Sequence, residues 1–83
     1  MTRENFNRLP HKQKLLLVFT EGTYLAQRLA TGYYADLFHL PGGYFVECFY
    51  HVVTRRLVAM RSLIPTYAYA PYLADIVLPA DLL

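Results

Sequence analysis

The residues of this chain whose types could support chemistry lie around its one cysteine. Glu47 precedes Cys48, and His51 follows three positions later. A cysteine with a histidine partner can form a thiol nucleophile, and a Cys-x-x-His spacing is used by zinc ligands. Both uses need converging side chains, whereas residues three apart on a β-strand point to opposite faces. A buried, apolar role is therefore the expected one for Cys48, and no second ligand pair completes a metal site.

The other polar residues do not form a stronger candidate for a catalytic or binding site. Glu47 and His51 could form an acid–base pair, but we expect Glu47 to bind Arg61 and His51 to lie in a turn. His39 lies about 13 Å along the strand from the residue predicted to face Cys48, at ordinary strand rise. The chain has no Gly-rich phosphate loop, no G-x-S-x-G and no H-E-x-x-H motif. We expect no catalytic residue, no metal, no cofactor and no enzymatic activity.

Composition points to a small domain with more apolar surface than it can bury. The 83 residues allow one domain, spanning 1–83, and the apolar fraction is 55%, with eight Tyr and five Phe. Soluble domains usually contain about 45–50% apolar residues, and a chain this short has little interior. The excess indicates burial against a second copy or a partner. Alternatively, the tyrosines cap a small core and keep their hydroxyl groups in water.

Net charge and cysteine content further limit the possible class of protein and its location. The net charge of +2 and the pI of about 8.8 are mild for a nucleic-acid-binding domain. A single cysteine excludes an internal disulfide framework and favours a reducing compartment. The apolar run of Leu15 to Phe19 is too short for a signal peptide or a membrane span. These features predict a soluble, cytoplasmic protein without a membrane partner.

A β-hairpin centred on Pro41-Gly42-Gly43 organises the predicted fold. Residues 33–50 alternate aromatic, aliphatic and polar side chains around this turn. The predicted register places His39 opposite Tyr44, Leu37 opposite Val46, Ala35 opposite Cys48 and Tyr33 opposite Tyr50. A slip by one residue would set Leu37 against Glu47, which a half-buried hairpin should resist.

The flanking segments complete an α+β two-layer sandwich. Residues 1–9 are expected to be flexible unless Phe6 docks, and Pro10 begins a helix over 10–21 with an apolar stripe of Leu15, Leu16, Val18 and Phe19. Residues 23–64 form a four-stranded antiparallel meander, and a closing helix follows over 66–77. The last strand is predicted to set Tyr50 against Val58, Cys48 against Met60 and Glu47 against Arg61. This last pair brings opposite charges together.

The alternation divides the sheet into two predicted faces. The inner face, covered by the helices, holds Leu25, Leu29, Tyr33, Ala35, Leu37, Val46, Cys48, Val58 and Met60. The outer face is the predicted interaction surface and holds Tyr24, Arg28, Tyr34, Asp36, Phe38, Phe45, Glu47, Phe49 and Arg61, with Leu57 at its edge. Aromatic residues and arginine are enriched at interfaces, and paired charges set the orientation of partners.

Two functions follow from the predicted outer face. The first is a non-enzymatic protein–protein interaction module, a small accessory or subunit protein that binds another protein or forms a homodimer. The alternative is a nucleic-acid-binding accessory protein whose sheet aromatics stack unpaired bases beside arginines. Asp36 and Glu47 count against the alternative because they would repel phosphate.

The chain also resembles small uncharacterised bacterial α+β proteins that have a helix, a four-stranded meander and a closing helix. The resemblance spans roughly Leu15 to Leu78 and is carried by Gly22-Thr23, Leu25-Ala26, Arg28, Tyr44-Phe45-Val46-Glu47, Tyr50, Thr54 and Arg61-Ser62. Those relatives have an Asp-Pro-rich third hairpin loop, from which His51-Val52-Val53 departs. The resemblance implies the fold and brings no activity or functional residue with it.

Overall fold

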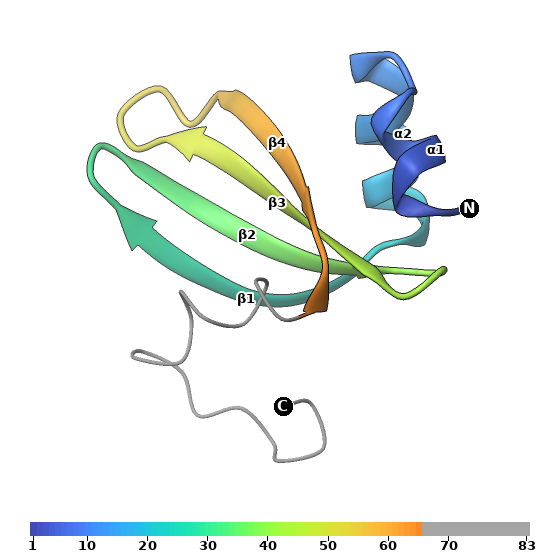
Figure 1. Cartoon of the computed structure of the whole chain (residues 1–83). Helices are drawn as coiled ribbons and strands as arrows, with labels where there is room; N and C mark the ends of the chain where they lie inside the picture. The colour runs from blue at the N-terminus through green and yellow to red at the C-terminus, as the bar shows by residue number, and fades with distance from the viewer. Residues whose placement is uncertain (66–83) are drawn as a thin grey trace.

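A computed structural model describes residues 1–65, which form two helices and a four-stranded antiparallel sheet (Figure 1). The elements are α1 (Arg3–Asn7), α2 (His11–Glu21), β1 (Thr23–Ala30), β2 (Tyr33–Leu40), β3 (Tyr44–His51) and β4 (Leu57–Leu63). The strand order β1-β2-β3-β4 is the predicted meander. The helix predicted over 66–77 lies outside the described residues.

The N-terminal segment forms α1 because Phe6 docks. Thr2 caps the helix by accepting a hydrogen bond from the Asn5 backbone N–H at 3.2 Å. The Phe6 side chain is buried, and its ring centroid lies 5.7 Å from that of Tyr44 on β3. Residues 1–9 were expected to be flexible unless Phe6 docked, and Phe6 does dock.

The helix predicted over 10–21 is α2, with Pro10 immediately before it and Gly22 immediately after it. Gly22 donates its N–H to the Val18 carbonyl at 2.9 Å and has an extended backbone, with φ of −75°. Glycine is needed there because a Cβ would collide with the Val18 carbonyl oxygen. The chain can thus turn directly from α2 into β1.

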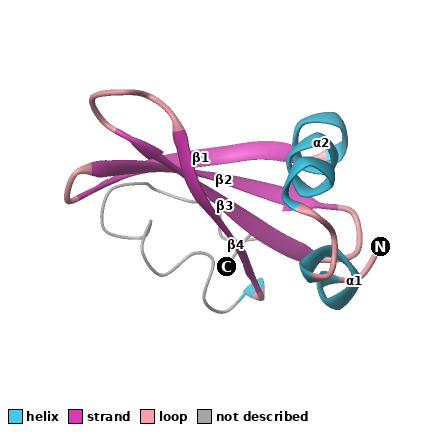
Figure 2. Cartoon of the chain, turned by 90° about the horizontal axis from the view of Figure 1, so that it is seen from above, coloured by secondary structure: helices cyan, strands magenta, loops and turns pink. Residues whose placement is uncertain are grey.

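Both helices lie at one end of the sheet, beside the β2–β3 turn, as Figures 1 and 2 show. The β1–β2 turn and the β3–β4 loop lie at the opposite end. The face that the helices cover is called the helix face, and its core contains the buried residues Phe6, Val18, Phe38, Leu40, Tyr44, Val46 and Cys48. The helices therefore cover only part of this face.

The predicted register between β2 and β3 is wrong by one residue. Leu40 pairs with Tyr44, and Leu37 pairs with Glu47, which is the pairing that the sequence argument rejected. The turn contains only Pro41, Gly42 and Gly43, and both glycines have positive φ angles, 108° and 77°. A three-residue hairpin loop of this kind replaces the longer loop that the prediction required.

This shift changes which residues of β2 and β3 lie on the same side of the sheet. Ala35 lies opposite Phe49 and Asp36 opposite Cys48, so Ala35 and Cys48 are on different sides of the sheet. The second face, called the Glu47 face, carries a smaller apolar cluster of Ala26, Leu37 and Phe45, with Leu25 and Leu63 packed against it. The predicted inner face thus mixed residues from both sides.

Two bulges alter the outer strand pairs. The shift between Tyr24 and Ala26 lets Tyr24 pair with Phe38 on the helix face, while Arg28 pairs with Ala35 on the Glu47 face. In β4 the predicted pairs Glu47–Arg61 and Cys48–Met60 are confirmed. Tyr50, however, pairs with Leu57 because the register shifts after Phe49.

Candidate interaction surface

The predicted interaction face does not exist as one surface, because the corrected register divides its residues between both sides of the sheet. Tyr24, Tyr34, Asp36 and Phe38 belong to the helix face, whereas Arg28, Phe45, Glu47, Phe49 and Arg61 belong to the Glu47 face. A partner binding one face cannot contact the other set. Each group therefore has to be considered separately.

The Glu47 face is centred on a buried ionic cluster. The Glu47 side chain is fully buried, and its carboxylate binds Arg28 Nε at 3.1 Å and also Arg61. The guanidinium carbons of both arginines lie 5.6 Å from the centroid of the Phe49 ring. Desolvation of a carboxylate is costly, and two arginines with a supporting ring reduce that cost.

The strand register positions the members of this cluster. Arg61 on β4 lies directly opposite Glu47 on β3, so that pair is local. Arg28 starts from β1, two strands from Glu47, and its neighbour on β2 is Ala35. Because Ala35 has only a methyl group, the Arg28 side chain can cross above it to reach β3. This explains a small residue at a fully buried sheet position.

The arrangement of the Glu47 face suits structural support better than binding. Arg28 and Arg61 are both engaged by Glu47, and Phe45 and Glu47 are buried within the chain. A platform for bases would need exposed rings beside free cations. The Glu47 face does not offer that combination at its centre.

Cys48 is buried and lies on the helix face, opposite Asp36 and Met60. Burial, and then the nearby carboxylates of Asp36 and Glu47, raise the pKa of the Cys48 thiol to about 12. The thiolate is the nucleophilic form of cysteine, so this environment suppresses reactivity near neutral pH. His51 pairs with Tyr33 on the other face, so Cys48 and His51 diverge as predicted.

His51 instead organises the β3–β4 loop. Its Nδ1 atom accepts hydrogen bonds from the Val53 and Thr54 backbone N–H groups at 3.2 and 3.4 Å. Within residues 1–65, no three His, Cys, Asp or Glu side chains are grouped so that they could hold a metal ion. None of the helices in these residues is long and apolar enough to cross a membrane.

Sequence reasoning missed an apolar surface where α2 meets β1. Leu16, Phe19 and Tyr24 expose 64%, 55% and 54% of their surface, and together they are called the α2–β1 patch. Leu16 and Phe19 were predicted to lie in the buried stripe, but only Val18 of α2 is fully buried. Five consecutive apolar residues go more than once around a helix, so some of Leu15 to Phe19 had to remain outside.

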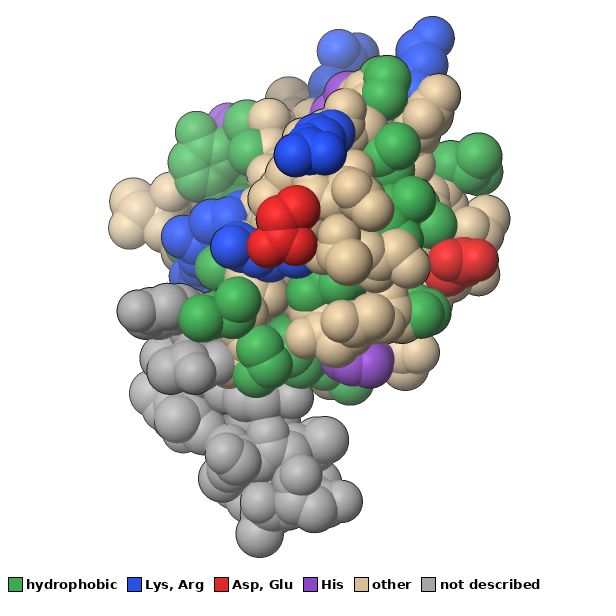
Figure 3. Space-filling model, turned by 45° about the vertical axis from the view of Figure 1, so that its right-hand side comes forward, with side chains coloured by type: hydrophobic (Ala, Val, Ile, Leu, Met, Phe, Trp, Pro, Cys, Tyr) green, Lys and Arg blue, Asp and Glu red, His purple; other side chains and the backbone are tan. Residues whose placement is uncertain are grey.

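Ring contacts make the patch continuous across the two elements. The Phe19 and Tyr24 ring centroids lie 5.7 and 5.8 Å from that of Phe38, both in edge-to-face geometry. Phe38 is buried and contacts both rings, so it links the two elements. Burial, and then the charge of Asp36, raise the pKa of the Tyr24 hydroxyl, so this phenol is neutral near pH 7. Hydrophobic side chains reach the surface at this end of the molecule (Figure 3).

The patch adjoins the outer edge of β1. Among residues 1–65 no strand pairs with that edge, because the sheet begins at β1. Its sequence, TYLAQRLA, contains neither the lysine nor the proline that commonly protect exposed edges, although a bulge at Leu25 interrupts its first half. The opposite edge strand, β4, is approached by α1, where Ser62 Oγ donates to Asn7 Oδ1 at 2.6 Å.

No protein-family model, curated protein or solved structure matches this chain.

Proposed function

We propose that this protein is a non-enzymatic protein-binding module that associates with a second copy of itself through the α2–β1 patch and the edge of β1. The observation that carries the proposal is the exposure of Leu16, Phe19 and Tyr24 beside a strand edge without a partner among residues 1–65. Large apolar side chains grouped in this way are typical of interaction sites.

The strand edge is part of the proposal because the patch alone is too small. A stable interface buries about 800 Å² on each partner, far more than three side chains provide. Backbone pairing along the eight residues of β1 adds contact area and satisfies N–H and C=O groups that otherwise face water. The patch would then supply apolar contacts, and backbone pairing along β1 would set the orientation of one partner relative to the other.

A second copy is the simplest partner for this edge. Two β1 strands paired antiparallel about a two-fold axis form an isologous interface, in which each copy contributes the same residues. Both patches lie next to the pairing strands, so a single two-fold rotation places the two patches and the two strand edges in one interface. This proposal keeps the homodimer expected from the sequence but moves it from the sheet face to the sheet edge.

The polar groups support a non-enzymatic role. Glu47 is held between two arginines, Cys48 is buried with a raised pKa, and His51 accepts hydrogen bonds from its own loop. These side chains serve the fold. A cytoplasmic location fits a chain whose one cysteine is free.

The nucleic-acid alternative receives less support from the geometry. Tyr34 and Phe38 lie on the helix face, whereas Phe45 and Phe49 lie on the Glu47 face. The stacking platform of the alternative required these four rings on one side.

Light scattering across a concentration series tests the proposal. Wild type should approach twice the 9.6 kDa chain mass at micromolar concentration, and the Phe19→Ser/Tyr24→Ser variant should remain monomeric. Val53→Ser is the matched control because it replaces a side chain that is 80% exposed on the distant β3–β4 loop. A monomeric wild type, or a dimer that survives Phe19→Ser/Tyr24→Ser, would contradict the proposed function.

A further inference from the structure

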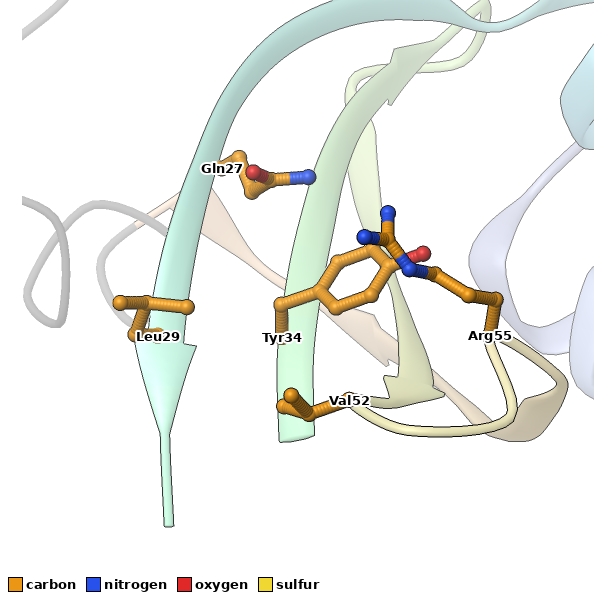
Figure 4. Close-up of a pocket in the computed structure, with 5 residues that line it drawn as sticks. All are labelled: Gln27, Leu29, Tyr34, Val52 and Arg55. Carbon is orange, nitrogen blue, oxygen red and sulfur yellow. The ribbon is translucent and has the colours of Figure 1, made fainter. Parts of the chain in front are cut away.

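A second candidate site lies at the end of the sheet away from the helices. An open pocket of about 280 Å³ is lined there by Gln27 and Leu29 of β1, Tyr34 of β2, and Val52 and Arg55 of the β3–β4 loop (Figure 4). Gln27, Leu29 and Tyr34 all belong to the helix face, beyond the area that the helices cover. The pocket thus combines apolar walls with an amide, a phenol and a cation.

The loop that supplies Val52 and Arg55 is held by several hydrogen bonds. Val52 donates its N–H to the Gly32 carbonyl at 3.2 Å, which ties this loop to the β1–β2 turn. Arg55 donates its N–H to the His51 carbonyl at 2.8 Å, and Arg56 donates to Thr54 Oγ1 at 3.3 Å. A loop fixed in this way presents its side chains without having to order them on binding.

Arg55 has the backbone conformation of a glycine. Its φ angle of 62° makes it the one non-glycine residue with positive φ in the part of the chain that the structure describes. Such a conformation is unfavourable for an arginine and is often retained where a side chain has a function. Arg55 lines the pocket together with Tyr34 (Figure 4), and it forms no ion pair with another residue among 1–65.

Tyr34 supplies a flat aromatic surface. One side of its ring stacks on Tyr50, with centroids 5.1 Å apart and planes 16° apart. Tyr34 lines the pocket, whereas Tyr50 does not. Gln27 Nε2 donates to Asp36 Oδ1 at 2.8 Å, which fixes the amide and leaves its oxygen as an acceptor. Asp36 pairs with Gln27 in the register and does not itself line the pocket.

We propose that this pocket binds a small ligand that combines a planar aromatic ring with an anionic group. The ring stacks on Tyr34 between Leu29 and Val52, and the anion pairs with Arg55. The pocket of about 280 Å³ lies just below the usual ligand-site range of about 300–1,000 Å³, which limits the ligand to one ring system and one small charged group. A nucleoside monophosphate and an aromatic carboxylate both have this chemistry, and both are suitable probes.

Titration of the full chain by NMR or calorimetry tests the site with four probes. AMP or benzoate should bind, whereas adenosine, which lacks the anion, and ribose 5-phosphate, which lacks the ring, should bind at least roughly tenfold more weakly, the factor expected for losing one charged hydrogen bond or one stack. Binding of AMP but not benzoate would identify a phosphate-bearing ring, and binding of both would identify planar anions generally. If neither binds at millimolar concentration, or ribose 5-phosphate binds as well as AMP, the proposal is wrong.

Two variants locate the binding to this pocket. Arg55→Asn removes the charge while keeping a residue that tolerates positive φ, so the fold should persist and affinity should fall by about tenfold or more. Arg56→Gln is the matched control because it removes an exposed charge from the same loop outside the pocket. Tyr34→Leu should weaken binding by removing the stacking surface. Unchanged affinity in Arg55→Asn, or an equal loss in Arg56→Gln, would overturn the assignment.

Discussion

Arg61 lies directly opposite Glu47 across β3 and β4, and the two side chains form an ion pair on the Glu47 face. This is the cross-strand pair predicted from the sequence. Arg28 binds the same carboxylate from the far side of β2, at 3.1 Å. The two arginines differ in exposure, since the Arg28 side chain is 16% exposed and that of Arg61 is 53% exposed.

This difference predicts unequal effects of removing each arginine. Arg28→Met should lower the free energy of unfolding by about 3 kcal/mol, because it weakens the compensation of a buried carboxylate. Arg61→Met should cost about 1 kcal/mol or less, because the Arg61 side chain is half exposed and screened by water, and Arg28 still pairs with the buried Glu47 carboxylate. Urea unfolding measures both, with Arg56→Gln as a control for the loss of an exposed charge. Equal costs, or a larger cost at Arg61, would contradict the assigned roles.

A larger side chain at Ala35 should destabilise the fold, because Arg28 of the ionic cluster crosses β2 at this position. Ala35→Leu would place a branched side chain where Arg28 crosses β2, so we expect a cost of about 1–3 kcal/mol from overpacking. In the combination with Arg28→Met the cost of Ala35→Leu should be smaller, because the crossing side chain has been shortened. A double-mutant cycle with no coupling between these two positions would show that Arg28 does not depend on Ala35.

The Tyr44 hydroxyl is buried and has no hydrogen-bond partner among residues 1–65. Burial, and then the charge of Glu21, raise the pKa of this phenol. Tyr44→Phe keeps the ring that contacts Phe6 and removes the unsatisfied group, so it should leave stability unchanged or raise it by about 1 kcal/mol. Thermal and urea unfolding provide the measurement. A loss of more than about 1 kcal/mol would mean that the hydroxyl has a partner.

Alkaline pH should destabilise the fold through Cys48 and Tyr50. Burial is the main cause that raises both pKa values to about 12, from ordinary values of 9.0 and 10.0. The unfolded chain therefore loses these protons first, so stability is retained below about pH 9 and falls as pH rises towards 12. The slope is at most about 1.4 kcal/mol per pH unit for each proton.

Urea unfolding at a series of pH values measures this dependence. Cys48→Ala should flatten the decline that begins near pH 9, and Tyr50→Phe should flatten the part above pH 10. Stability that stays constant from pH 8 to about pH 11, or a decline that neither variant alters, would show that the two groups titrate alike in the folded and unfolded chains.

The sequence was sufficient for α2, the four-stranded meander and the last strand's charge pair. Alternation, Gly22 and the Pro41-Gly42-Gly43 turn carry that information locally. The register of the central hairpin was not predictable in the same way, because it depends on a three-residue loop and on Glu47 receiving two arginines from other strands. The Glu47 carboxylate can lie opposite Leu37 because arginines from two other strands neutralise its charge.

The candidate sites were harder to predict than the fold. The α2–β1 patch depends on which residues of an apolar helix face the sheet, and its only signal was a run too long for one helix face. The pocket depends on a positive φ at Arg55 and on a hydrogen bond between two loops. Neither feature has a local pattern in the sequence.

Amide hydrogen exchange along β1 tests the central claim most directly. Backbone N–H groups of β1 that do not donate to β2 should exchange slowly at micromolar concentration and rapidly on dilution, because only the second copy protects them. Phe19→Ser/Tyr24→Ser should exchange rapidly at both concentrations. Rapid exchange of these amides in wild type at every concentration, or protection that dilution leaves unchanged, would contradict association through the β1 edge.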